Sequence, residues 1–234
     1  MTTALDAAGQ LKLVIFDCDG VLVDSERASC RATAEFARSL GLKISDDEAH
    51  DRFSGKALSQ VVKELEHETG HALPKNTALK MRENLVRLMQ KMAEPVEGAP
   101  EMLQGIRGLQ LPFRVGSNSS VVEMDAKFER TQMTTFFAKN RVHSANDMDE
   151  PKPSPEVYLY AAKAEGVLPE SCVVIEDSDT GAEAARRAGM SCVLLRSEDL
   201  PLPAFWPTPG FVRIGHLSEL VPLLRKTLQS QKEN

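Results

Sequence analysis

The first apolar run of the chain stops at two acidic residues. Residues 11–16 read LKLVIF, and Asp17 and Asp19 follow before a turn signal at Gly20. A short run of β-branched and aromatic residues bounded by a turn predicts a buried strand. Carboxylates at the end of such a strand lose hydration, which costs free energy unless a cation or a hydrogen-bond donor faces them. The pattern therefore predicts a charged partner at this strand end.

Residues 25–93 show a different pattern, in which apolar residues recur at helical spacing. One helix is expected from about Ser25 to a stop at Gly41, and others over residues 57–69 and 76–92. The sequence EPVEGAP at 94–100 then interrupts the pattern with two prolines and a glycine. We expect residues 25–93 to form a small all-helical domain, and residues 1–24 and 94–234 to form a second, larger one.

Helix and strand patterns alternate in the rest of the chain. Strands are expected over residues 113–117, 141–144, 172–175, 191–195 and 211–214, with helices over 99–108, 120–131, 154–165 and 180–188 and from 217. This alternation predicts an α/β fold, a Rossmann-like parallel sheet with helices on both faces. Such sheets bind ligands at the carboxyl ends of their strands.

Polar residues occupy those predicted strand ends. Four carboxylates in one pocket would repel one another unless a divalent cation lies between them, and Mg²⁺ prefers oxygen ligands. A lysine and an amide-rich turn before a helix suit an anion such as phosphate. A cation facing carboxylates beside an anion site is typical of phosphoryl transfer. The residues are Asp17, Asp19, Glu176 and Asp177 for the cation and Ser117, Asn118 and Lys152 for the anion.

Composition and charge limit the kinds of partner and the cellular location that the sequence predicts. The formal net charge of −6 argues against a general nucleic-acid binder. The apolar runs are too short for a membrane span, and the first residues lack the features of a signal peptide. The four cysteines are scattered, as expected for reduced thiols in the cytoplasm. We expect a cytoplasmic protein that acts on a small molecule, as a monomer or a small homo-oligomer.

The order and separation of these motifs resemble the haloacid dehalogenase superfamily, in particular its β-phosphoglucomutase-like subgroup. The matching residues are Asp17-x-Asp19-Gly20, Ser117, Lys152 in a KPxPxxY context through Tyr158, and Glu176-Asp177-Ser178 followed by Gly181. Within the subgroup the chain is similar to bacterial sugar-phosphate phosphatases, 6-phosphogluconate phosphatase among them. The family inserts a helical cap just after its first motif, which is where residues 25–93 lie.

The resemblance implies a Mg²⁺-dependent phosphatase that acts on a sugar phosphate or a sugar-acid phosphate. Asp17 would be the nucleophile that forms an aspartyl-phosphate, and Asp19 the general acid and base. Asp17, Asp19 through its backbone carbonyl, Glu176 and Asp177 would hold Mg²⁺, while Ser117, Asn118 and Lys152 would bind phosphate. In residues 25–93, the positive charges of Arg52 and Lys56 flank a glycine loop, where they would either contact an acidic substrate or lie on the solvated surface. Ser25 would either contact the substrate or cap its helix. Ser119, Ser120 and Asp179 are expected to be helix caps.

Two other functions remain open. Mutases of the subgroup keep all four motifs, but they use a cap arginine and an early cap histidine where this chain has Leu58 and Ser29. That difference favours water over a phosphosugar as the acceptor. A non-catalytic metabolite-binding relative is the second alternative. Dehalogenases of the superfamily lack the second aspartate, so Asp19 argues against dehalogenation.

Overall fold

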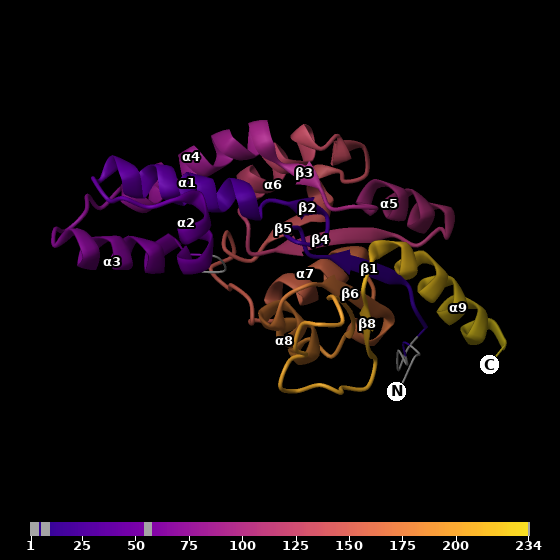
Figure 1. The fold of residues 1–234 in the computed structure, drawn as a ribbon. Coiled ribbons are helices and arrows are strands. Elements are labelled where there is room, and N and C mark those ends of the chain that lie inside the picture. The colour runs from indigo at the N-terminus through magenta and orange to yellow at the C-terminus, as the bar shows by residue number, and fades with distance from the viewer. Residues whose placement is uncertain (1–4, 6–9, 54–57, 234) are drawn as a thin grey trace.

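The computed structural model describes residue 5, residues 10–53 and residues 58–233. Its centre is a parallel sheet in the order β5-β4-β1-β6-β7-β8, which confirms the predicted α/β fold (Figure 1). The strands are β1 (Leu13–Phe16), β4 (Phe113–Ser117), β5 (Val142–Ser144), β6 (Cys172–Glu176), β7 (Ser191–Leu195) and β8 (Phe211–Ile214). β1 lies between β4 and β6, so the three strands that end in the predicted site residues are neighbours.

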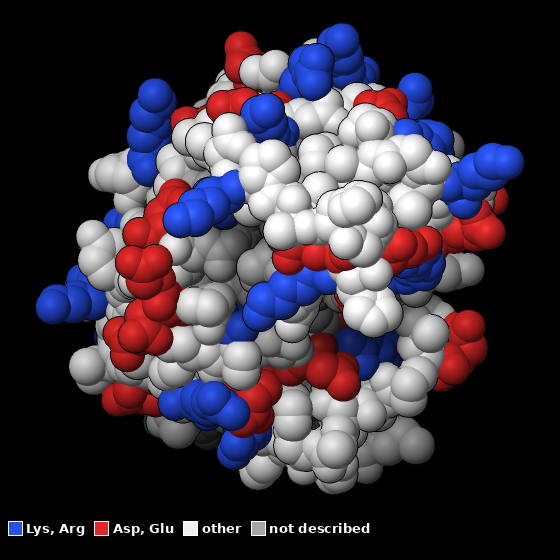
Figure 2. Space-filling view, turned by 90° about the vertical axis from the view of Figure 1, so that its left-hand side faces the viewer, with Lys and Arg blue, Asp and Glu red and all other residues white. Residues whose placement is uncertain are grey.

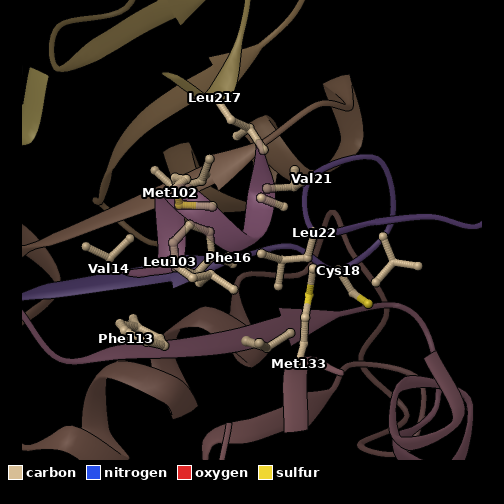
Figure 3. Close-up of a cluster of buried hydrophobic side chains, with 14 of the residues drawn as sticks. Val14, Phe16, Cys18, Val21, Leu22, Met102, Leu103, Phe113, Met133 and Leu217 are labelled. Carbon is tan, nitrogen blue, oxygen red and sulfur yellow. The ribbon is translucent and has the colours of Figure 1, made fainter. Parts of the chain in front are cut away.

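Helices cover both faces of the sheet because β1 is apolar on both sides. Val14 and Phe16 point to one face, where they pack with residues of α5 (Ala99–Gly108), of α9 (Leu220–Glu233) and of the turn before α9 (Figure 3). Leu13 and Ile15 point to the other, against α7 (Glu156–Glu165) and α8 (Asp179–Arg187). α6 (Val121–Arg130) follows β4 and packs on the first face. This double burial fixes the end of β1 in the middle of the molecule.

Within residues 25–93, the structure describes four helices, which lie to one side of the sheet (Figure 1). They are α1 (Glu26–Ser39), α2 (Asp46–Phe53), α3 (Leu58–Thr69) and α4 (Thr77–Met92). Buried residues such as Ala37, Leu65 and Met81 form a hydrophobic cluster of their own, whereas Ala28 and Met89 belong to the cluster on the first face of the sheet. The described helices at residues 26–39, 58–69 and 77–92 agree with the predicted ones, whereas α2 was not predicted.

A short antiparallel ribbon connects this helical segment to the sheet. β2 (Val23–Asp24) pairs with β3 (Glu94–Pro95), and the backbone N–H of Val96 donates to the carbonyl of Leu22 at 3.1 Å. The sequence at 94–100 predicted a linker or a domain boundary, and its first residues form one strand of this ribbon. Both chain crossings therefore lie side by side.

The four cysteines agree with the expectation of reduced thiols. Cys18, Cys30, Cys172 and Cys192 are all buried, and none of them is in a disulfide. Within the described part of the chain, each helix is too short or too polar to span a bilayer. On the face shown in Figure 2, basic and acidic side chains are interspersed instead of forming a continuous basic field.

Candidate active site

The predicted site residues meet at the carboxyl edge of the three central strands. Asp17 follows β1 directly, and its backbone N–H donates to the carbonyl of Ile175 at 2.9 Å. Glu176 ends β6 and Ser117 ends β4. Lys152 comes from the loop between β5 and α7 and is buried with them. Residues from four separate parts of the sequence thus meet at one edge of the sheet.

Lys152 joins the first and last of these strand ends. Its Nζ lies 2.5 Å from Oδ1 of Asp17 and 2.7 Å from Oε1 of Glu176. The hydroxyl of Tyr158, on α7, donates to the same Glu176 oxygen at 2.6 Å. The other Glu176 oxygen accepts from the Ser178 hydroxyl at 2.9 Å and from the backbone N–H groups of Asp177 and Ser178. Glu176 is therefore fully engaged by protein donors.

The two carboxylates beside Glu176 carry unbalanced charge. Burial raises the pKa of Asp17 to about 7, even though Lys152 opposes the shift. Burial, together with the charge of Glu176, raises the pKa of Asp177 to about 8. Burial would also raise the pKa of Glu176, but Lys152 and the hydrogen bonds hold it below its usual value. One lysine is thus too little positive charge for three carboxylates.

The missing charge has a place at which a cation would fit. Carboxylate oxygens of Asp17, Glu176 and Asp177 all lie within 4.8 Å of one another. Asp177 lies against Gly20, where a Cβ would come within 2.0 Å of its Oδ2. Gly181 leaves room for Glu176 in the same way, because a Cβ at position 181 would lie 1.6 Å from Oε1 of Glu176. Both glycines keep these carboxylates where they are. A groove of about 460 Å³ opens beside Gly20 and Asp177.

Asp19 is held separately, by three donors. Lys127 Nζ lies 2.6 Å from its Oδ1, and the Ser119 hydroxyl donates to its Oδ2 at 2.7 Å. Ser25 Oγ also donates to Oδ1. Burial would raise the pKa of Asp19, but Lys127 and these hydroxyls hold it below its usual value. The two aspartates of the DxD motif therefore face different groups.

The second strand end presents the expected small polar groups. The Ser117 hydroxyl accepts from the backbone N–H of Ser119 at 3.2 Å, and Asn118 Oδ1 accepts from the backbone N–H of Lys152 at 2.9 Å. Asn118 thereby connects the β4 end to the loop that carries Lys152. Its side chain positions that loop in the described structure, and its contact with phosphate stays a prediction.

The expected helix caps are partly wrong. Ser120 caps α6 and forms a capping box with Glu123, as predicted. Ser119 instead contacts Asp19, and Ser25 makes no capping hydrogen bond to α1. Ser178, not Asp179, caps α8, because its hydroxyl accepts from the backbone N–H of Gly181 at 3.0 Å. Asp179 pairs with Arg196 at 2.6 Å.

Arg52 is the predicted basic cap residue that the structure describes, and its ion pair lies within the helical segment. Arg52, at the end of α2, forms an ion pair with Glu68 of α3 at 2.5 Å. Both side chains are 39% exposed, so water screens the pair. Lys56 lies outside the described residues. A role for either residue in substrate binding stays a proposal.

Sequence reasoning missed Lys127 and gave Tyr158 no role. The sequence did contain evidence for Lys127, because this lysine shares the buried face of α6 with Met124 and Phe128. A lysine on an apolar helix face is uncommon unless its charge is paired. Its partner, Asp19, lies more than a hundred residues earlier in the chain, so the pairing needed the fold.

Comparison with known proteins identifies the family. Residues 14–195 match the family model described as haloacid dehalogenase-like hydrolase. The chain is 31% identical over 213 residues to 6-phosphogluconate phosphatase of Escherichia coli, with 90% of this chain and 95% of the relative covered.

Two solved structures share the architecture. A haloacid dehalogenase family hydrolase from Deinococcus radiodurans, with bound phosphate and sodium, aligns with a TM-score of 0.72 at 29% identity and covers 93% of this chain and 96% of its own. A putative β-phosphoglucomutase from Thermotoga maritima aligns at 0.75 and 24% identity, over 92% and 99% of the two chains, which shows the fold alone.

The chain belongs to the haloacid dehalogenase-like hydrolases. It is an enzyme of the phosphoric monoester hydrolase type, as the sequence predicted.

Proposed function

We propose that the protein is a Mg²⁺-dependent phosphatase that hydrolyses a sugar phosphate or sugar-acid phosphate through an aspartyl-phosphate on Asp17. The observation that carries the proposal is the convergence of Asp17, Lys152 and Glu176, joined by contacts of 2.5 and 2.7 Å at the end of β1. Relatives named as phosphatases for 6-phosphogluconate and fructose 1-phosphate support the substrate class.

The donors fit Mg²⁺, which takes oxygen ligands and tolerates few of them from protein. Asp17 and Asp177 would ligate it directly, and the backbone carbonyl of Asp19 would add a third oxygen. Glu176 already accepts from five protein donors. We therefore assign it to hold Lys152 and to reach the ion through water. Bound Mg²⁺ would supply the positive charge that the buried carboxylates and the phosphate together lack.

The chemistry then follows from the protein's own groups. An Asp17 oxygen attacks phosphorus while the bond from phosphorus to the leaving oxygen breaks. Asp19 must first take up a proton, because Lys127 favours its ionised form, and it gives that proton to the leaving oxygen. Ser117, Asn118 and Lys152 hold the phosphate oxygens, where Lys152 offsets charge that builds up in the transition state. Asp19 next takes a proton from water, which attacks phosphorus and releases inorganic phosphate and the free Asp17 carboxylate.

The helical segment would select the substrate. We propose that residues 25–93 form a cap domain on the core of residues 1–24 and 94–234, joined by the β2–β3 ribbon, and that Ser25, Arg52 and Lys56 contact the leaving group. Closure of such a segment excludes water and completes a site. The four reduced cysteines support a cytoplasmic location.

The test is turnover of phosphorylated metabolites by the purified protein, ranked by kcat/KM with Mg²⁺ and after exhaustive chelation. Release of inorganic phosphate only with Mg²⁺, with a sugar phosphate or sugar-acid phosphate ranked first, is expected. Conversion of a phosphosugar to its isomer without phosphate release would show a mutase instead. Binding of a metabolite without any turnover would show the non-catalytic alternative.

A further inference from the structure

Lys127 is a buried cation that has no role in the proposed reaction steps. Only 3% of its side chain is exposed, compared with 36% for the Asp19 side chain that it contacts. Its Nζ lies 2.6 Å from Asp19 Oδ1 and 2.7 Å from the Ser119 hydroxyl. Ser119 in turn donates to the second Asp19 oxygen at 2.7 Å. The three residues form a closed ring of contacts around one carboxylate.

Such a ring fixes the direction in which the carboxylate points. An aspartate held at one oxygen can still rotate about its side-chain bonds, whereas contacts at both oxygens restrict that rotation. A lysine buried to this extent is tolerated only when it is paired, because an unpaired charge in this place would be costly. The site therefore retains a costly buried ion pair next to the reacting groups.

The ring comes from the core and not from the helical segment. Ser119 and Lys127 belong to the β4–α6 connection and to α6, whose position β4 and the capping box at Ser120 determine. Ser25, the third donor, precedes α1 and belongs to the helical segment. A change in the position of that segment would remove Ser25 and leave the other two contacts in place.

We propose that Lys127, acting with Ser119, is a positioning residue that aims the Asp19 carboxyl at the leaving oxygen. This inference rests on the proposed phosphatase function. Proton transfer from a positioned acid contributes most when the leaving group is strongly basic. If Asp19 is misaligned, the hydrolysis rate should therefore fall more for phosphate esters of weakly acidic alcohols and phenols than for those of acidic phenols.

The test compares phenyl phosphate with 4-nitrophenyl phosphate, two esters of similar shape whose leaving groups differ in acidity. kcat/KM is the right quantity, because it reports the steps up to departure of the first leaving group. Lys127→Met is expected to lower kcat/KM about 100-fold for phenyl phosphate and about tenfold or less for 4-nitrophenyl phosphate. Ser119→Ala, which keeps the lysine charge, should shift the ratio in the same direction by a smaller factor.

Arg114→Met is the matched control, because Arg114 is another buried cation paired with a carboxylate, Glu165, at 2.8 Å. It lies three residues before the carboxyl end of β4, so its loss should lower stability without changing the ratio for the two esters. Equal losses on both esters in Lys127→Met and Ser119→Ala would overturn the positioning role. If Lys127→Met does not fold, the ratio in Ser119→Ala decides alone. A wild type that hydrolyses neither ester with Mg²⁺ would overturn the proposed function itself, and the positioning role with it.

Discussion

The carboxylate of Asp17 is the proposed nucleophile of the site. Asp17 is 7% exposed, contacts Lys152 and lies in the same carboxylate cluster as Asp177. Asp17→Asn keeps the shape of the side chain but removes the nucleophilic charge. We expect the rate of 4-nitrophenyl phosphate hydrolysis with Mg²⁺ to fall on the order of 10³-fold or more, with the circular dichroism spectrum unchanged. A variant with a tenth of the wild-type rate would contradict the role of Asp17.

Gly181 leaves the space that the Glu176 side chain occupies. A methyl group at this position would lie 1.6 Å from Glu176 Oε1, so Glu176 would have to move away from Lys152. We expect Gly181→Ala to raise the Mg²⁺ concentration for half-maximal rate by about tenfold, the usual effect of disturbing a group behind metal ligands.

Gly108→Ala is the control for this change. Gly108 is also a helical glycine, but a Cβ there meets nothing within 4 Å. The Mg²⁺ requirement of Gly108→Ala should equal that of wild type. Equal behaviour of the two variants would show that Glu176 tolerates displacement.

At the scale of elements, the apolar patterns predicted the sheet and its helices well. β1 and β6 are short, continuous apolar runs that lead directly into the acidic residues Asp17 and Glu176, so in these two strands one sequence feature marks both the element and the site. α2 was missed because DDEAHDRF is mostly polar, and Ala49 and Phe53 are the members of the helical cluster among its described side chains. Its signal was a capping box, in which Ser45 and Glu48 exchange hydrogen bonds. The β2–β3 ribbon has two residues in each strand, too few for any periodicity.

α2 and α3 provide the test of substrate selection by the helical segment. Arg52 is already paired with Glu68 across these helices, so it would have to exchange that partner for an acidic substrate. We expect Arg52→Ala or Lys56→Ala to lower kcat/KM about tenfold for the best sugar-phosphate substrate, the cost of one charged hydrogen bond. Hydrolysis of 4-nitrophenyl phosphate should be nearly unchanged. Parallel losses on both substrates would instead indicate a general effect on the fold.

For the whole molecule, the buried carboxylates link folding to pH and to the cation. The pKa values of Asp17 and Asp177 rise from 3.8 in the absence of structure to about 7 and about 8 in the fold. The folded state then binds more protons than the unfolded chain between about pH 4 and 8, so this contribution to stability is lost as the pH rises through that window. Mg²⁺ binds the ionised carboxylates and should restore the loss, most strongly at the upper end of the window.

The measurement is the unfolding midpoint with and without Mg²⁺ at pH 5.5 and at pH 8. With Mg²⁺ at roughly 100 times its dissociation constant, the midpoint should rise by about 5–10 °C at pH 8 and by much less at pH 5.5, where protons compete for the same oxygens. Asp177→Asn removes one of the two titrating groups, so its metal-free form should lose less stability between the two pH values than wild type does. Equal Mg²⁺ shifts at both pH values would mean that the carboxylates are already ionised at pH 5.5, and the link between their burial and the cation would then be wrong.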